Sequence, residues 1–403
     1  MAKTKRRLIT IAHSYCVALN RRLAHELARE GGGDWEVTAV APSFFHADLR
    51  PLALEPYQGP GPEPCRVEPV AAHFSKRVPF MLYGRKLREL LRGPWDVVHG
   101  WEEPYVLSGG QIANWSPRNA AYVFYTFQNL PKRYPPPFSW IERYCLDRCS
   151  GWLAAGDTVM EARLERGYGR NGKPRRVIPL GVALDTFYPN PSAGSEILRK
   201  LGWNSPGPPV IGYLGRFVPE KGLDFLMGVL DRLKSRHQTP WRMMFVGGGP
   251  MEPALRAWAE THDDAVRVVT GVSHDQVPAH LCAMDLLAAP SQSAPHWKEQ
   301  LGRMLIEAFA CGVPVVASDS GEIPYVVADA GIVLGEKDQN GWETVLGDLL
   351  QNPGRRHELA HRGLDRAKST YAWPVIARSH LEFFEECLEA KSRSCRVRSA
   401  DRL

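Results

Sequence analysis

The cationic residues best placed to bind a phosphate lie within residues 212–222. Gly215 and Arg216 end a run of apolar residues typical of a buried strand, and Lys221 comes just before a stretch with helical periodicity. Glycine lets a ligand approach the backbone closely, and two cations at a strand end and a helix start suit a diphosphate. A turn with two surface bases is the alternative, and this segment alone does not decide between the two.

Glu299 is predicted to lie in a loop, and Glu307 in the helix that follows it and starts near Gly302. The free N–H groups and the positive dipole end of that helix would face the same pocket. Carboxylates accept paired hydrogen bonds from vicinal diols, so the pattern indicates an anion site between two acids that bind sugar hydroxyls. Two ordinary surface acids are the alternative, but Glu307 lies among apolar residues, where an unpartnered charge is costly.

Three glycines follow another predicted strand directly, beginning with Gly247 and Gly248. They permit close approach of a nucleotide, although the motif is weak by itself. It is not a GxGxxG sequence, and no such loop follows the first predicted strand either. This argues against a dinucleotide-binding domain for nicotinamide or flavin.

The elements that must position these residues alternate along the chain. Short runs rich in Val, Ile and Leu are separated by stretches with helical periodicity, which is typical of parallel sheets buried on both faces. One series of predicted strands covers residues 8–12, 36–41, 96–99, 121–126 and 152–155, and a second covers 210–214, 242–246, 266–269, 286–289 and 313–317. We therefore predict an α/β protein with two doubly wound Rossmann-like domains, joined by a linker at residues 189–194. Ligands of such sheets bind beyond the carboxyl ends of the strands, so we expect the two domains to face each other across a cleft.

The amino-acid composition and the placement of charge exclude several classes of protein. The 403 residues are 44% hydrophobic and 23% charged, as in ordinary globular proteins. The formal net charge of +6 comes from basic residues at the two ends, which does not resemble a nucleic-acid-binding surface. The eight cysteines form no CxxC motif, which indicates reduced thiols. With no secretory or membrane-spanning pattern, we expect a cytoplasmic protein.

Several segments taken together resemble a known family. Residues 215–222, 247–250 and 299–316 occur in that order, with residues 177–187 before them and 318–324 after them. This order is similar to that of retaining glycosyltransferases of family 4, the glycosyl transferases group 1, which have the GT-B fold. The resemblance is dense from about residue 175 to 335 and looser in the first domain.

The resemblance implies three parts: residues 1–188 as an acceptor-side domain, 189–372 as a nucleotide-sugar-binding domain, and 373–403 as a helix that crosses back to domain one, with a basic tail. It also implies roles for the motif residues. Arg216 and Lys221 would hold the donor diphosphate, and Glu299 would bind hydroxyls of the donor sugar. The remaining donor contacts would be Gly215, Gly247, Gly248, Val272 near the base, Gln300, Leu301 and Gly302 through the backbone, and Glu307 at the ribose.

In the first domain the sequence departs from the family pattern. Many relatives have a His in the active site where this chain has Gln128, and no glycine pair follows the first predicted strand. His13, His99 and Glu102 also lie at predicted strand ends. Contact with the acceptor and ordinary loop structure are both open for these residues, and we interpret Gln128 as the mark of a variant subgroup.

The predicted activity is metal-independent transfer of a hexosyl group, with retention, from a UDP- or GDP-linked sugar. No metal or other cofactor is expected. The acceptor is a small molecule, a glycan or a lipid-linked molecule. The mixture of aromatic and basic residues at 73–87 leaves a peripheral membrane contact open, although we favour a helix with solvated bases. Two alternatives to transfer are a catalytically silent sugar-nucleotide-binding protein and a sugar-nucleotide epimerase of the same fold.

Overall fold

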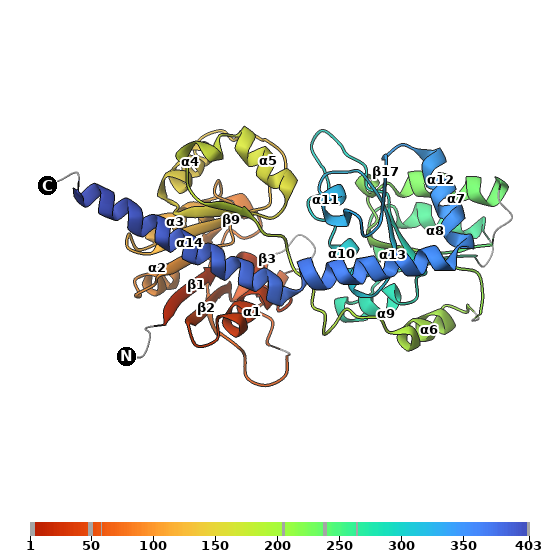
Figure 1. Cartoon of the computed structure of the whole chain (residues 1–403), viewed down its shortest axis with the longest axis horizontal. Helices are drawn as coiled ribbons and strands as arrows, with labels where there is room; N and C mark the ends of the chain where they lie inside the picture. The colour runs from red at the N-terminus through yellow and green to blue at the C-terminus, as the bar shows by residue number, and fades with distance from the viewer. Residues whose placement is uncertain are drawn as a thin grey trace. The chain divides into compact units, whose positions relative to one another are not determined.

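Two parallel sheets organise the chain, each in its own unit. The computed structural model describes residues 5–46, 51–57, 59–203, 206–236, 240–262 and 265–400. Unit 1 contains Met1–Pro179 together with Trp373–Leu403, and unit 2 contains Leu180–Ala372 (Figure 1). The division falls before the expected linker because Val182 and Phe187 are buried in the core of unit 2.

In the described part of unit 1, seven parallel strands form one sheet in the order β11-β10-β9-β8-β1-β2-β5. The strands are β1 (Arg6–Ile11), β2 (Trp35–Pro42), β5 (Arg66–Val70), β8 (Val97–Gly100), β9 (Ala121–Thr126), β10 (Gly151–Ala154) and β11 (Arg175–Val177). Two short antiparallel pairs stand beside the sheet: β3 (Phe44–His46) with β4 (Pro51–Ala53), and β6 (Ala72–His73) with β7 (Leu82–Tyr83).

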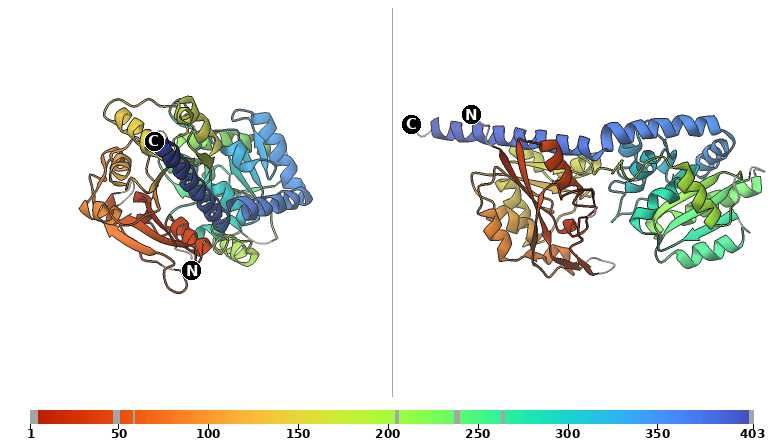
Figure 2. Two further views of the ribbon diagram at one scale, coloured as in Figure 1. Left: turned by 60° about the vertical axis from the view of Figure 1, so that its left-hand side comes forward. Right: turned by 90° about the horizontal axis from the view of Figure 1, so that it is seen from below.

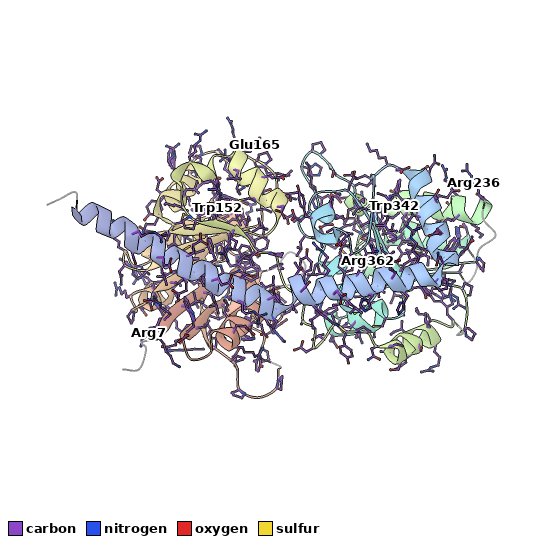
Figure 3. All side chains as sticks on the ribbon, in the orientation of Figure 1. Arg7, Trp152, Glu165, Arg236, Trp342 and Arg362 are labelled. Atoms are coloured by element: carbon purple, nitrogen blue, oxygen red, sulfur yellow. The ribbon has the colours of Figure 1, made fainter. Side chains whose placement is uncertain are left out.

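Helices cover both faces of this sheet. One face packs on α2 (Arg85–Leu91), α3 (Leu107–Trp115), α4 (Phe138–Arg148) and α5 (Asp157–Glu165), around a core that includes Trp152 (Figure 3). The other face carries α1 (Arg22–Gly31) and α14 (Trp373–Ala400), which pack on each other (Figure 2). The return of the last helix to the first domain agrees with the prediction. Residues 401–403 of the expected tail lie outside the described residues.

Unit 2 has a six-stranded parallel sheet in the order β14-β13-β12-β15-β16-β17. Its strands are β12 (Val210–Arg216), β13 (Arg242–Gly248), β14 (Val266–Val269), β15 (Leu286–Ala289), β16 (Val315–Ser318) and β17 (Ile332–Leu334). Its helices are α6 (Pro191–Lys200), α7 (Leu223–Arg236), α8 (Glu252–Glu260), α9 (Val277–Leu281), α10 (Arg303–Ala310), α11 (Ile323–Val327), α12 (Gln339–Gln351) and α13 (Pro353–Arg366).

The strands of unit 2 are apolar on both sides because each side faces a core. On β13, Met244 and Val246 belong to the cluster around α10, whereas Met243 and Phe245 belong to the cluster around α7 and α12, which includes Trp342. This alternation is what continuous apolar runs predict for a doubly wound parallel sheet. The two-domain α/β prediction is therefore confirmed.

Each sheet has one point where the order of its strands reverses direction. In unit 1 the chain moves from β1 outward to β2 and later returns to place β8 on the other side of β1. In unit 2 it moves from β12 to β13 and β14, and returns to place β15 beside β12. Ligands of open α/β sheets bind beyond the carboxyl ends of the strands at such switch points. The residues after β1 and β8, and those after β12 and β15, are therefore the places to search.

Among the described residues, no helix combines the length and the apolar composition that crossing a bilayer requires.

The packing of α14 on unit 1 leads to a stability prediction. A Cβ atom on Gly151 would lie 2.4 Å from Cys387 Sγ and 3.0 Å from the carbonyl oxygen of Pro174. We expect Gly151→Ala to lower the free energy of unfolding by about 1–3 kcal/mol through overpacking. Chemical denaturation of the single and double variants measures this. Cys387→Ala removes the sulfur that the new methyl group would meet. The double variant Gly151→Ala/Cys387→Ala should therefore lose less unfolding free energy than the sum of the two single variants, by at least about 0.5 kcal/mol. Strict additivity would mean that this strand and helix are not in contact.

Candidate functional site

A pocket of about 430 Å³ opens at the switch point of unit 2. It lies where the turn after β12 meets the loop after β15 and the first turn of α10. Its lining side chains carry both charge signs beside apolar groups. They belong to Leu214, Gly215, Arg216, Lys221, His274, Val277, Trp297, Glu299, Gln300, Arg303, Met304 and Glu307.

A buried ion pair joins the two segments that build the pocket. Lys221 lies in a short helical turn, Pro219–Lys221, and its Nζ pairs with Glu299 Oε2. Both residues are less than 10% exposed. The hydroxyl of Ser291 donates to the same carboxylate at 3.1 Å. The pair therefore fixes the position of both charged groups before any ligand binds.

Backbone contacts hold the two segments close enough for this pair. Gly222 follows Lys221 with φ +68°, and a Cβ there would lie 1.9 Å from the carbonyl oxygen of Pro290. On the far side of the loop, the amide of Glu322 donates to the carbonyl of Glu299 at 3.0 Å. Only glycine combines this left-handed φ with such a close approach, which accounts for Gly222 in the motif.

Arg216 is the exposed cation of the pocket. It is the last residue of β12, and Tyr213 Oη donates to its carbonyl oxygen at 2.7 Å. Gly215 and Arg216 stand opposite Gly247 and Gly248 in the parallel register of β12 and β13. A Cβ on Gly247 would lie 1.8 Å from the carbonyl oxygen of Gly215, so the glycines are needed for these strands to pair up to the edge of the pocket.

The helix α10 brings its amino end and two charged side chains to the same place. Gly302 caps the helix with φ +69°, and Arg303 is its first residue. Arg303 Nε lies 3.3 Å from Glu307 Oε1, one turn later. Burial raises the pKa of Glu307 to about 7, although Arg303 opposes the shift. At neutral pH this carboxyl group can therefore donate as well as accept a hydrogen bond.

The structure brings six of the predicted site residues to this pocket and places the others elsewhere. Arg216, Lys221, Glu299, Gly215, Gln300 and Glu307 line it together. Gly247 and Gly248 lie on the adjacent strand, Gly302 caps α10, and the Leu301 side chain packs in the core. Val272 lines a second pocket of unit 2, of about 480 Å³, with Gly271 and His280.

Sequence analysis overlooked six of the lining residues, among them Trp297, Arg303 and His274. Lys221 Nζ lies 5.2 Å from the centre of the Trp297 ring. Trp297 stands two residues before Glu299, and Arg303 four residues before Glu307 on one helix, so proximity to the predicted acids was the available signal.

Unit 1 also has polar residues at its switch point. His13 follows β1 and Glu102 follows β8, and His13 Nδ1 lies 2.8 Å from Glu102 Oε2. The backbone amide of His13 and the hydroxyl of Tyr83 also donate to Glu102, at 2.8 and 2.6 Å. Burial lowers the pKa of His13, but the Glu102 carboxylate more than offsets this, so the net direction is upward. His13 is therefore oriented by a buried acid and remains partly exposed.

The other two acceptor-side candidates have structural contacts. His99 is fully buried, lies 3.0 Å from Thr10 Oγ1 through Nδ1, and has a pKa well below its ordinary value because of burial. Gln128 donates to Tyr134 Oη and accepts from the amide of Leu130, both at 3.2 Å. The structure thus gives His99 no access to a ligand and ties Gln128 to its own loop.

Among the residues that the structure describes, no group of three or more His, Cys, Asp or Glu side chains is arranged to hold a metal ion.

Comparison with known proteins points to one family. Residues 196–366 match the family model "Glycosyl transferases group 1". A GDP-mannose-dependent alpha-(1-6)-phosphatidylinositol monomannoside mannosyltransferase of Mycolicibacterium smegmatis is 35% identical over 202 residues, which are 49% of this chain and 52% of that protein. The match thus spans about half the length of this curated relative.

Solved structures match over nearly the whole chain. A sucrose-phosphate synthase from Thermosynechococcus elongatus has a TM-score of 0.69 and 19% identity, covering 96% of this chain and 100% of that one. HepE of Anabaena in complex with UDP has a TM-score of 0.67 and 17% identity, covering 94% and 100%. At these identities the likeness concerns the fold, which is GT-B as predicted.

The raised pKa of Glu307 leads to a pH prediction. The folded protein holds this proton up to about pH 7, whereas an unfolded glutamate releases it near 4.5. Raising the pH through this window therefore favours unfolding, by up to ~3 kcal/mol for this one group. In Glu307→Gln the side chain stays neutral, so urea unfolding at pH 5, 6, 7 and 8 should show a shallower loss of stability than in the native protein. Parallel pH profiles for the two proteins would contradict the assignment.

Proposed function

We propose that this chain, of which residues 196–366 belong to the glycosyl transferases group 1 family, transfers a sugar from a nucleotide diphosphate sugar to an acceptor. The observation that carries the proposal is one pocket that is lined by Arg216, Lys221, Glu299 and Glu307 and by the amino end of α10. The chemistry of these groups suits a pyrophosphate with a sugar at each end: the cations and the helix end attract phosphate, and the acids accept hydrogen bonds from hydroxyl groups.

The cations of the pocket would act on the leaving group. As the bond between the anomeric carbon and the phosphate oxygen breaks, negative charge grows on the nucleoside diphosphate. Arg216, Lys221 and the free N–H groups of α10 would stabilise that charge, and the ion pair with Glu299 already holds Lys221 in place, which limits the reorganisation needed. This is the chemistry that a divalent ion supplies in other enzymes, and we propose that transfer here proceeds without a metal.

The acids of the pocket would hold the two sugars. Glu299 is an ionic partner of Lys221, so a donor diphosphate competes for the same ammonium group while sugar hydroxyls donate to the carboxylate. Glu307, which is buried on α10, would bind the ribose. The paired state of Lys221 and Glu299 thus keeps both groups satisfied while the pocket is empty.

We further propose that transfer retains the anomeric configuration. The acceptor hydroxyl attacks the anomeric carbon from the face that the diphosphate leaves, forming the new carbon–oxygen bond as the old one breaks. The hydroxyl proton passes to an oxygen of the departing phosphate. In this scheme no side chain needs to act as a nucleophile.

For the donor we propose a GDP- or UDP-linked hexose. The mannosyltransferase relative is described as GDP-mannose-dependent, and the Anabaena structure contains UDP. The acceptor is a small molecule, a glycan or a lipid-linked molecule, and the relative acts on a phosphatidylinositol mannoside. Thermal shifts with GDP, UDP and their sugars test the donor, because specific binding raises the melting temperature by mass action.

Two other outcomes are distinguishable in the same system. A silent binding protein would show a nucleotide-dependent thermal shift but no turnover with any acceptor. An epimerase would convert the donor with no acceptor present. Release of a nucleoside diphosphate that depends on an acceptor supports transfer.

Substitutions in the pocket should separate chemistry from folding. We expect Lys221→Met and Glu299→Gln each to lower kcat by about 10²–10³-fold, the effect of removing one preorganised group from a transition state. Steady-state kinetics with the donor found in the screen measure this, and circular dichroism checks the fold. The control is Arg199→Met, which removes an exposed cation of α6 in the same unit. This variant should leave kcat unchanged. Near-native rates in both pocket variants would refute the proposed site.

A further inference from the structure

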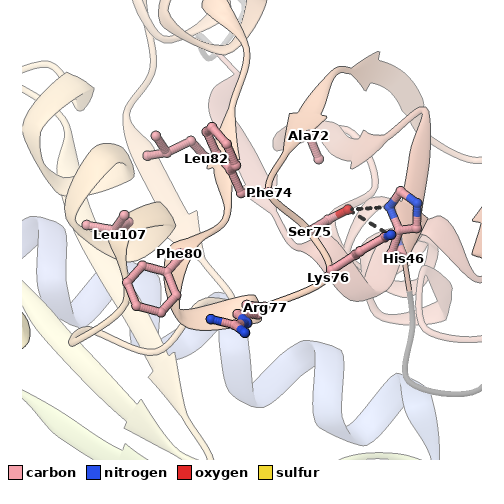
Figure 4. Close-up of a pocket in the computed structure, with 9 residues that line it drawn as sticks. All are labelled: His46, Ala72, Phe74, Ser75, Lys76, Arg77, Phe80, Leu82 and Leu107. Atoms are coloured by element: carbon pink, nitrogen blue, oxygen red, sulfur yellow. Dashed lines mark hydrogen bonds between the residues drawn. The ribbon is translucent and has the colours of Figure 1, made fainter.

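Unit 1 contains a larger pocket that the proposed donor site does not use. Its volume is about 680 Å³, within the range of about 300–1,000 Å³ typical of small-molecule sites. Figure 4 shows Phe80 and Leu107 on one side of it and Ala72 and Ser75 on the other. The remaining lining residues are His46, Phe74, Lys76, Arg77 and Leu82.

The walls of this pocket are held by specific contacts. Ser75 is buried, accepts a hydrogen bond from the amide of His46 at 3.2 Å and lies 3.1 Å from His46 Nδ1. This ties the segment after β6 to β3 (Figure 4). Opposite, the Phe80 ring meets the Phe138 ring edge to face at 5.5 Å. The pocket is therefore a built feature of unit 1.

Phe74 lines this pocket with an exposed ring and a strained backbone. Its side chain is 72% exposed, and its backbone has φ +58°, a conformation that is strained for a bulky residue. Water-exposed aromatic area and a strained backbone both cost free energy in the empty protein. Such features persist at ligand sites, where the bound molecule covers the apolar surface.

Two cations give the pocket its charge. Lys76 and Arg77 are exposed, and neither forms an ion pair with an acid among the described residues. Of the lining residues within the described part of unit 1, none is acidic. An apolar pocket with two cations matches a molecule that has a hydrocarbon chain and a phosphate.

The pocket also lies next to the switch point of unit 1. Strand β7 has two residues, Leu82 and Tyr83. Leu82 lines the pocket, whereas Tyr83 Oη donates to Glu102, the acid that orients His13. The ring of His13 in turn stacks on Phe45 of β3, the neighbour of the lining residue His46. Contacts through β3 and β7 therefore connect the pocket to His13 and Glu102.

We propose that unit 1 binds a phosphate-bearing lipid, with the hydrocarbon chain among Phe74, Phe80 and Leu107 and the phosphate on Lys76 and Arg77. Binding itself does not depend on the transferase activity. The assignment of this lipid as the acceptor rests on the proposed function, and it narrows the three acceptor classes given there to one.

Calorimetric titration with octyl phosphate, below its micellar concentration, tests the chemistry. We expect saturable one-to-one binding, at least tenfold tighter than that of octyl glucoside, which has the same chain without the charge. Inorganic phosphate, which has no chain, should bind at least tenfold more weakly as well. From hexyl to decyl phosphate the affinity should rise about two- to fourfold per added methylene group. Equal affinities for octyl phosphate and octyl glucoside, or no effect of chain length, would overturn the proposal.

Variants locate the site. Ala72→Phe fills the pocket and should reduce octyl phosphate affinity at least tenfold. Lys76→Ser/Arg77→Ser should do the same and remove the preference over octyl glucoside. The matched control is Arg85→Ser/Arg88→Ser, which removes two exposed cations of the adjacent helix α2 that do not line the pocket. An equal loss in the control would show non-specific attraction and overturn the assignment to Lys76 and Arg77.

The variant Phe74→Gly distinguishes a loss of binding from a loss of folding. Glycine adopts the positive φ without strain, so this variant should melt no lower than the native protein while losing affinity for octyl phosphate. Trp140→Ser, a comparable exposed aromatic on α4, should keep the affinity. Unchanged binding in Phe74→Gly would exclude Phe74 from the site.

A final pair of measurements separates this inference from the proposed function. Dihexanoyl phosphatidylglycerol should displace octyl phosphate, and failure to do so would overturn a lipid as the occupant. Lys221→Met, in unit 2, should leave octyl phosphate binding unchanged. If Lys221→Met abolished that binding, the ligand would be occupying the anion pocket of unit 2, and the inference for unit 1 would fail while the proposed transfer stood.

Discussion

The buried ion pair between Lys221 and Glu299 is the interaction on which the site of unit 2 depends. Its partners are 78 positions apart in the sequence and meet because β12 and β15 are neighbours in a parallel sheet. That adjacency brings the turn after one strand against the loop after the other. Gly222 permits the close approach of the two backbones, and the amide of Gln292 donates to the carbonyl of Glu220 across them, so the charges are placed by the sheet and the main chain rather than by flexible side chains. A ligand therefore binds to charged groups that folding has already positioned, so little free energy is lost in arranging them.

Much of this arrangement could be predicted from local sequence because it follows from periodicity. Continuous apolar runs gave the parallel strands, and a strand end followed by Gly-Arg or by an acid indicated the binding edge. Some elements carry weaker local signals. Strand β5 contains Pro69, which is tolerated because β5 lies at the edge of its sheet. Such features depend on contacts with residues far away in the sequence, which a short stretch of sequence does not contain.

The candidate residues of unit 1 show that sequence position does not predict how deeply a side chain is buried. His13, His99 and Gln128 all stand at strand ends, so sequence position treats them alike. Burial separates them: His99 is enclosed beside Thr10, Gln128 bonds to Tyr134, and His13 stays partly exposed on Glu102. The apolar pocket escaped prediction for a related reason. Its residues come from β3, β6, β7 and α3 and from the segment between β6 and β7, which turns at Phe74 with a positive φ.

The helix α14 has a consequence for how the molecule is made. Unit 2 is one uninterrupted stretch of chain, whereas unit 1 needs a helix that follows it. A ribosome therefore releases every residue of unit 2 before it releases the helix that covers one face of the first sheet. Phe383, Phe384 and Cys387 are fully buried in the folded protein, so the surface they cover stays open to water, or to a chaperone, until this helix has left the ribosome. Of the two units, the one whose translation begins first thus has all of its residues available last.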